Sequence, residues 1–315
     1  MAIQSKDMPM VAIITRTKDR RMLLKRAIQS VESQTYPDYI HVILNDGGDR
    51  QALETLLKQH SNKRRKVIHN QRSVGITKAL NQAIRAVDSK YVTILDDDDT
   101  WPPERLEKTI PYLEATGEKA VVVKMDTIIE EIHGNEIRTI SQSLHPESYE
   151  GEISLFKQCH KNYLSNAVIT YRREVYEELG GYDETLPVGE DWDFGIRLLL
   201  KYDVAFLRDE KPLAFYHQRP NQHGDDGNSV HAAVYQQEKT INLIRNRYLR
   251  QDIAAGRFGV GYVMNKLEHD RLAVIRLEGH MNFCTEQVKQ YIEQYINRRT
   301  LAGRFARYLG KRKRS

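Results

Sequence analysis

The chain has 315 residues and a formal net charge of +5, with 40% hydrophobic and 29% charged residues. This length and composition predict one large globular domain with a smaller appendage. Two cysteines exclude a disulfide framework, and the absence of a C-x-x-C pair argues against structural zinc. The polar N-terminus lacks a signal core, and no apolar run could span a bilayer, so we expect a cytoplasmic protein with at most peripheral contact with the inner face of the cell membrane.

The first hundred residues alternate between strand-like and helix-like segments. Short apolar runs at residues 11–14, 41–44, 67–68 and 91–95 predict buried strands, and apolar residues at helical spacing predict helices near residues 23–31, 53–57 and 76–87. This alternation predicts an α/β fold with a mostly parallel sheet and helices on both faces. Ligands of such sheets bind beyond the carboxyl ends of the strands, so the polar loops that begin at Thr15, Asn45 and Asp96 are expected to converge.

The rest of the chain is less regular. Apolar runs predict strands at residues 120–126, 167–171, 204–207 and 213–216, and helices at residues 174–179 and 191–202. Residues 217–231 are rich in Gly, Asn, Asp and His and predict a loop. The pattern then becomes helical, so we expect an α/β domain over residues 1–231 and a helical region over residues 232–315.

Four consecutive carboxylates, Asp96 to Asp99, follow the strand at residues 91–95. Adjacent carboxylates near a surface repel one another by about 1–4 kcal/mol per close pair. A divalent metal ion that holds a diphosphate would neutralise them at the tip of a strand. The alternative interpretation is a solvated acidic turn.

Five sequence motifs resemble those of glycosyltransferase family 2, in the same order along the chain. They are ITRT at residues 14–17, NDGGD at 45–49, GITKALN at 75–81, LDDDD followed by Thr and WP at 95–102, and GGYDE at 180–184 leading to GEDWD at 189–193. The resemblance covers residues 9–217. It implies a GT-A fold, a nucleotide-sugar donor, a Mn²⁺ or Mg²⁺ cofactor and inversion at the anomeric carbon.

The resemblance places the donor against the first three strands. It implies that Thr15 and Arg16 meet the nucleotide and that Asp46 accepts the imide N–H of uracil or thymine. The alternative for Asp46 is a turn residue before two glycines. Arg72 and Lys78 could neutralise the diphosphate, although Lys78 also fits a solvated helix face.

Within the acidic cluster the resemblance separates the roles by position. Asp98 is expected to bind the metal ion directly, and Asp96 to face the ribose or the sugar. Asp97 occupies the variable position of the substrate-binding loop, and Asp99 supports the loop. His217, after a predicted strand, is a candidate further metal ligand, with a purely structural histidine as the alternative.

The GEDWD motif precedes a predicted helix and carries the expected catalytic base, Asp191. The resemblance implies that Asp191 removes the proton from the acceptor hydroxyl as that oxygen attacks the anomeric carbon. A helix cap is the alternative for Asp191. Glu190 is expected to orient the site or touch the acceptor, and Trp192 to stack on a sugar or to lie in the core.

The C-terminal region predicts two amphipathic helices, at residues 288–296 and 301–309, with arginines around the second. The segment from Thr300 to Ser315 therefore suits an anionic membrane surface. A helix that packs on the catalytic domain and leaves a solvated basic tail is the alternative. We expect no nucleic-acid partner, because no recognised binding module accompanies the charge.

These observations predict a metal-dependent inverting enzyme that moves a sugar from a UDP- or dTDP-linked donor to a hydroxyl of a glycan or lipid-linked glycan, in cell-surface polysaccharide synthesis. A sugar nucleotidyltransferase is one alternative, but residues 15–20 lack the glycines that its nucleotide loop needs. A non-catalytic carbohydrate-binding protein on the same fold is the other, and the intact acidic motifs disfavour it.

Overall fold

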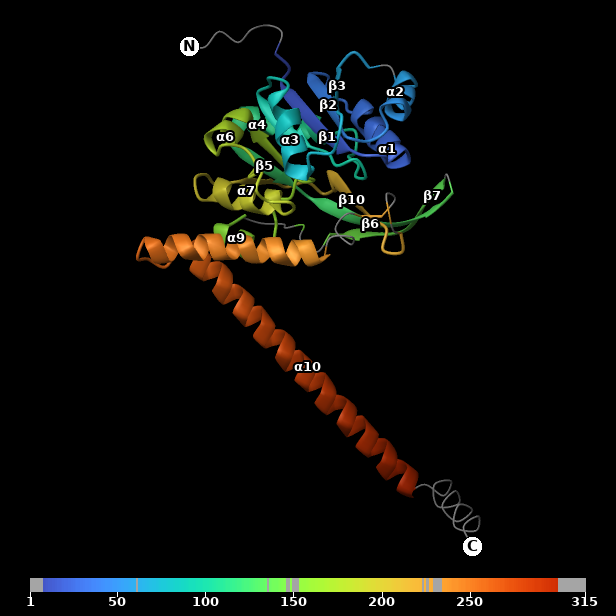
Figure 1. The fold of residues 1–315 in the computed structure, drawn as a ribbon. Coiled ribbons are helices and arrows are strands. Elements are labelled where there is room, and N and C mark those ends of the chain that lie inside the picture. The colour runs from blue at the N-terminus through green and yellow to red at the C-terminus, as the bar shows by residue number, and fades with distance from the viewer. Residues whose placement is uncertain are drawn as a thin grey trace. The chain divides into compact units, whose positions relative to one another are not determined.

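The computed structural model describes residues 8–60, 62–134, 136–145, 148, 153–222, 224, 227–228 and 234–299. A seven-stranded sheet with the order β3-β2-β1-β4-β8-β5-β9 forms its centre (Figure 1). The strands of this sheet are β1 (Val11–Thr17), β2 (Tyr39–Asp46), β3 (Arg65–Asn70), β4 (Tyr91–Ile94), β5 (Ala120–Val123), β8 (Ile169–Arg172) and β9 (Ala205–Leu207). Only β8 runs antiparallel to its neighbours β4 and β5, so the predicted mostly parallel α/β sheet is confirmed.

Helices cover both faces of this sheet. Successive residues of a strand point to opposite faces, so one strand packs against helices on both sides. On β2, Ile43 packs with leucines of α1 (Arg21–Glu32) and α2 (Arg50–Lys58). Its neighbours Val42 and Leu44 belong to the larger core, which includes side chains of α3 (Ile76–Arg85) and α4 (Arg105–Thr116). This burial on both sides explains why the strands read as continuous apolar runs.

A second, three-stranded sheet has the order β10-β6-β7 and consists of β6 (Met125–His133), β7 (Glu136–Leu144) and β10 (Ala214–Gln218). The sequence predicted one strand over residues 120–126, but the chain leaves the large sheet at Lys124 and enters the small one at Met125. A two-residue antiparallel bridge between Thr100 and Phe215 joins β10 to the loop after β4. This bridge brings β10 to the acidic cluster.

The remaining helices of the α/β part are α5 (Leu155–His160), α6 (Arg173–Glu178), α7 (Glu190–Leu199) and α9 (Val234–Ala254). Gly189 precedes α7 with a left-handed φ of 71°, and a Cβ atom there would contact Thr240 and Ile244 of α9. Tyr248 of α9 donates to Asp193 of α7 at 3.4 Å. Thus α9 packs against the start of α7.

The chain divides into two compact units, residues 1–261 and 262–315, so α9 groups with the α/β part. The boundary expected at residue 231 separates the parts by secondary-structure type, whereas this division follows contacts. The 40-residue helix α10 (Val260–Arg299) contains the helix predicted at residues 288–296, while the helix predicted at 301–309 lies outside the described residues. Among the described helices, none combines the length and the apolar character that crossing a membrane requires.

Candidate active site

Arg16, at the end of β1, connects two motifs that are far apart in the sequence. Its guanidinium donates to Asp96 at 2.9 Å, to Glu190 at 3.1 Å and to the carbonyl of Ile76 at 3.2 Å. Burial opposes the charge of Arg16, but the two carboxylates raise its pKa. The acidic cluster and the GEDWD motif therefore lie at the same edge of the sheet, one guanidinium apart.

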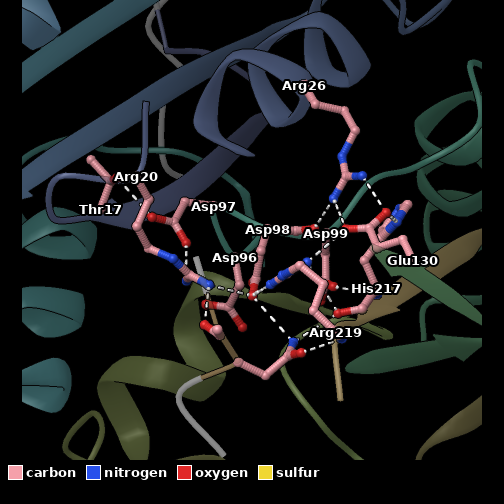
Figure 2. Close-up of polar contacts among 12 residues, drawn as sticks. Thr17, Arg20, Arg26, Asp96, Asp97, Asp98, Asp99, Glu130, His217 and Arg219 are labelled. Atoms are coloured by element: carbon pink, nitrogen blue, oxygen red, sulfur yellow. Dashed lines mark hydrogen bonds and ion pairs between the residues drawn. The ribbon is translucent and has the colours of Figure 1, made fainter. Parts of the chain in front are cut away.

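Asp98 is neutralised by two arginines of the chain itself (Figure 2). Its Oδ2 atom accepts from Arg20 at 2.8 Å and from Arg219 at 2.5 Å. Burial works against the negative charge, but Arg20 and Arg219 outweigh it and lower the pKa of Asp98. Asp98 is thus ionised and fixed between β1, the loop after β4 and the segment after β10.

The other three carboxylates of the cluster have different surroundings. Asp97 is buried and accepts from Thr17 and Arg20, both at 2.7 Å, and burial with the charges of its acidic neighbours raises its pKa to about 7. Asp99 is buried and accepts from the backbone N–H of His217 at 3.0 Å, and burial raises its pKa well above the usual value. Asp96 is the most open of the four, with 33% of its side chain exposed. It is therefore the one best placed to meet a ligand.

Glu130, on β6, is a buried hub that the sequence did not single out. Its carboxylate accepts from Arg26 at 2.6 and 3.0 Å and from Arg219 at 2.7 Å, and it lies 2.8 Å from Nδ1 of His217 (Figure 2). Burial alone would raise the pKa of Glu130, but the hydrogen bonds of His217 and Arg26 lower it to about 2. Because a carboxylate only accepts, Nδ1 of His217 carries the proton.

His217 therefore presents the lone pair of Nε2, which lies 2.8 Å from the hydroxyl of Thr100. Burial lowers the pKa of His217, so the ring is neutral near pH 7. A carboxylate on the far nitrogen is the arrangement that commonly orients a metal-binding histidine. In this structure, however, Thr100 occupies the position where a cation would meet Nε2.

The donor groups fit Mn²⁺ or Mg²⁺ in chemical type, since Asp96 and Asp98 offer hard carboxylate oxygens. The described residues contain no cluster of three or more His, Cys, Asp or Glu side chains that could hold a metal. Such cations are commonly held by one or two carboxylates together with substrate phosphates and waters. Asp98 and, after displacement of Thr100, His217 would be the protein ligands.

Asp191 lies in the first turn of α7, beside Glu190. The cap position of α7 is Gly189, whose left-handed φ favours glycine, so Asp191 lies inside the helix. Its carboxylate accepts from the N–H of Trp192 at 2.8 Å and from the side chain of Asn162. Burial and the charge of Glu190 raise the pKa of Asp191 to about 7, and Asp96 adds to this effect. Asp191 and the acidic cluster thus share one electrostatic environment.

At the second strand, Asp46 is fully engaged by the loop after β3. Its two oxygens accept from Asn70 at 2.8 Å, from Ser73 at 2.7 Å, and from the backbone N–H groups of Val74 and Gly75 at 2.9–3.1 Å. These hydrogen bonds lower the pKa of Asp46 although burial opposes them. Gly47 has a φ of 79°, and a Cβ there would lie 2.3 Å from the backbone of Ser73, so the two loops pack closely.

The other predicted donor residues differ in exposure. Arg72 and Lys78 are exposed, in the loop before α3 and on α3. The side chain of Thr15 is buried, with its hydroxyl 2.9 Å from Nε2 of His41, so it is not exposed to a ligand. Trp192 is 6% exposed and donates from Nε1 to the carbonyl of Gln158 at 2.6 Å, which matches the core alternative and not the sugar-stacking one.

Sequence reasoning missed four residues of this site: Arg20, Arg26, Glu130 and Arg219. Arg20 lies just before α1 and Arg26 lies within it, where basic residues look like ordinary helix surface. Glu130 lies on a half-exposed strand with acidic neighbours. Arg219, two residues after His217, was the most recognisable, since a basic residue near a proposed metal ligand suggests a counter-charge.

Comparison with known proteins shows the family of the chain. The model of the glycosyl transferase family 2 matches residues 12–180, and the chain belongs to this family. Over 209 residues it is 28% identical to an uncharacterized glycosyltransferase of Methanocaldococcus jannaschii, and this alignment covers 63% of this chain and 68% of the relative. Over 207 residues it is 28% identical to the putative colanic acid biosynthesis glycosyl transferase WcaA of Escherichia coli, and this alignment covers 65% of this chain and 71% of the relative.

The fold is also that of known glycosyltransferase structures. The S. aureus TarS fragment in complex with UDP-GlcNAc superimposes with a TM-score of 0.56 at 19% identity, covering 68% of this chain and 60% of that one. The chain thus spans less than two thirds of that structure. At this identity the likeness concerns the fold alone, and it confirms the expected GT-A type architecture.

Proposed function

We propose that the chain transfers a sugar from a nucleotide-sugar donor to a hydroxyl of a glycan or lipid-linked glycan, with inversion at the anomeric carbon. The observation that carries the proposal is the bridge of Arg16 between Asp96 and Glu190. Through Asp96, Arg16 holds the acidic cluster, which suits a donor diphosphate. Through Glu190, it holds the start of α7, where the neighbouring Asp191 suits the role of a base. One group of residues can therefore stabilise the leaving nucleoside diphosphate, and another can activate the attacking hydroxyl of the acceptor.

In this mechanism Asp191 is the general base. A carboxylate whose pKa is about 7 accepts a proton near neutral pH more readily than an ordinary one. It would take the proton of the acceptor hydroxyl while that oxygen forms its bond to the anomeric carbon. Glu190, fixed by Arg16, keeps the pKa of Asp191 raised and orients the acceptor side.

On the donor side, Asp96 would face the ribose or sugar, and Arg72 and Lys78 would reach the diphosphate from the β3–α3 loop and α3. Asp46 supports this loop and, in this proposal, would accept the imide N–H of a uracil or thymine base. A Mn²⁺ or Mg²⁺ ion, when bound, would supply positive charge that stabilises the leaving nucleoside diphosphate. Asp98 and His217 would hold it, and Arg20 and Arg219 would contribute further positive charge.

The biological setting that we infer is cell-surface polysaccharide synthesis with a UDP- or dTDP-linked donor. The naming of WcaA for colanic acid biosynthesis and the UDP-GlcNAc bound to TarS support this choice. We place the enzyme in the cytoplasm, peripheral on the inner face of the membrane, where lipid-linked acceptors are available. Residues 300–315, which lie outside the described residues, would provide the basic surface for that contact.

A donor screen tests this proposal. Purified protein is incubated with a panel of nucleotide sugars, with Mn²⁺ or with EDTA, and release of nucleoside diphosphate is measured. Release that EDTA abolishes, and that Asp191→Asn lowers strongly, supports transfer. Release of pyrophosphate from a nucleoside triphosphate and a sugar phosphate would instead identify a nucleotidyltransferase. A protein that binds the donor but releases no nucleoside diphosphate with any acceptor tested would be a non-catalytic binding protein.

A further inference from the structure

The helix α10 carries an apolar seam with a strict seven-residue repeat. The seam consists of Val274, Leu277, Met281, Cys284, Val288, Tyr291 and Tyr295, which alternate at spacings of three and four. Val274, Met281, Val288 and Tyr295 occupy position a of a heptad, and the other three occupy position d. Apolar side chains at a and d over successive heptads are the pattern by which helices pair as a coiled coil.

The side chains of this seam are exposed within the described chain. From Val274 to Tyr295 the exposed fractions of the six seam side chains other than Cys284 range from 45% to 70%, and Cys284 is exposed too. Single exposed apolar residues are ordinary, but a continuous stripe on a helix about 60 Å long is not. We propose that this seam pairs with the same seam of a second copy of the chain, as a two-stranded coiled coil that makes the protein a dimer.

The charges around the seam favour a second copy as the partner. Positions e and g flank a coiled-coil seam and set its partner by their charges. Between Val274 and Tyr295 the only charged residue at a, d, e or g is Glu278. Two copies therefore meet with almost no like-charge repulsion, and no charge pattern on the flanks demands a complementary foreign helix. The four other charges of this stretch, on Arg276, Glu286, Lys289 and Glu293, fall at the outer positions b, c and f.

A lipid surface fits this stretch less well. A helix that lies on an anionic membrane needs basic residues along its polar face. Residues 274–295 carry two basic side chains, Arg276 and Lys289, against three acidic ones, which gives a net charge of −1. Seam and basic tail are thus different features of the C-terminal region.

Two double variants of the full chain test the proposal. Met281→Glu with Val288→Glu puts two charges at a positions. Phe283→Glu with Gln290→Glu adds the same charge to the same turns, but at position c, outside the seam. Phe283 is 62% exposed and Met281 is 67% exposed, so the control matches the exposure of the tested residue.

The mass in solution is measured by light scattering and by sedimentation over a range of micromolar concentrations. We expect the unmodified chain and the c-position control to sediment at twice the mass of 36.7 kDa, and the seam variant to dimerise at least about 100-fold more weakly. Near-ultraviolet circular dichroism verifies that the α/β part of each variant stays folded. A monomeric unmodified chain, equal weakening by both variants, or a dimer that neither variant weakens would overturn the proposal. So would a seam variant that loses binding to anionic vesicles while the unmodified chain stays monomeric.

Discussion

The guanidinium of Arg16 donates to the carboxylate of Glu190 at 3.1 Å, although 174 positions separate the two residues in the chain. The same side chain reaches Asp96, so one residue at the tip of β1 holds the acidic cluster and the GEDWD motif together. An arginine suits this position because its planar fork bonds two carboxylates at once and stays charged at any physiological pH.

Asp191→Asn should abolish most of the transfer and leave the donor bound. Asparagine has nearly the same shape but cannot accept a proton, so loss of a general base predicts a fall in kcat of about 10²–10⁴-fold. The dissociation constant for the donor, measured by calorimetry, should change little. The exposed Glu210→Gln is the control for charge loss. If Asp191→Asn retains the turnover of the unmodified enzyme, Asp191 is not the base.

The rate should rise with pH through about 7. Only ionised Asp191 accepts a proton, and its raised pKa of about 7 means that the active form predominates above this pH and disappears below it. Burial is the main cause, and the charge of Glu190 adds to it. Glu190→Gln should therefore move the acid limb of kcat/KM to lower pH. An acid limb near pH 4 in the unmodified enzyme would contradict this prediction.

Asp98→Asn should remove the cation-dependent part of donor binding. With Mn²⁺, UDP is expected to raise the melting temperature of the unmodified protein, and this rise should vanish in the variant. The variant should also melt at a lower temperature without ligand, because Arg219 is wholly buried and loses a partner. Asp88→Asn, an exposed carboxylate near the amino end of β4, is the control. An unaltered Mn²⁺ effect in Asp98→Asn would place the cation elsewhere.

Glu130→Gln should destabilise the fold strongly. It removes one of the two carboxylates that pair with the buried Arg219, and it removes the carboxylate that pairs with the largely buried Arg26. Breaking a buried pair costs about 3–5 kcal/mol in the free energy of unfolding. Urea denaturation at pH 7 measures this loss, with Glu131→Gln, the more exposed neighbour on β6, as the control. Equal midpoints for the two variants would show that the hub contributes no special stability.

The same carboxylate predicts a pH dependence of stability. The pKa of Glu130 in the folded chain is about 2, below its unfolded value of about 4.3, so its contribution is complete above the unfolded pKa and disappears as the pH falls toward 2. The difference in the free energy of unfolding between the unmodified chain and Glu130→Gln, measured by urea denaturation, should therefore narrow by about 1–3 kcal/mol between pH 5 and pH 3. A difference that stays constant over this range would argue against an ionised Glu130.

Removal of residues 300–315 should release the protein from anionic vesicles. Each basic residue near such a surface contributes about 1 kcal/mol, so loss of the Arg-rich segment should abolish flotation with the vesicles at physiological salt. Neutral vesicles are the control. Unchanged flotation would favour the alternative in which this segment packs on the rest of the protein.

The sequence was most informative where local pattern and tertiary burial agree. The strands around Ile13, Ile43 and Val92 are buried on both faces, so their apolar runs predicted them directly. The β6–β7 hairpin was not predicted, because β7 is mostly exposed and its polar side chains give no period. The break at Lys124 could not be seen either, since the apolar run of β5 continues into Met125.

The site shows the same division. The carboxylates that a motif marks, such as Asp96 and Asp191, could be singled out from the sequence, although their roles remain predictions. Arg20 and Arg219, the partners of Asp98, could not be singled out, because their role depends on a distance between segments that only the fold sets. The buried hydroxyl of Thr15 and the buried indole of Trp192 likewise reflect which way a strand or helix faces, which a motif does not specify.

The long sequence separation between Asp98 and Arg219, 121 positions, has a consequence for synthesis on the ribosome. Arg20 and Arg26 precede the acidic residues, but the arginine that both Asp98 and Glu130 share is made only after β10. In a nascent chain that has emerged as far as β9, Arg20 and Arg26 compensate the burial of these two carboxylates only in part, because Arg219 is still missing. The α/β part is therefore expected to gain its final stability late, as one event, when β10 joins the small sheet.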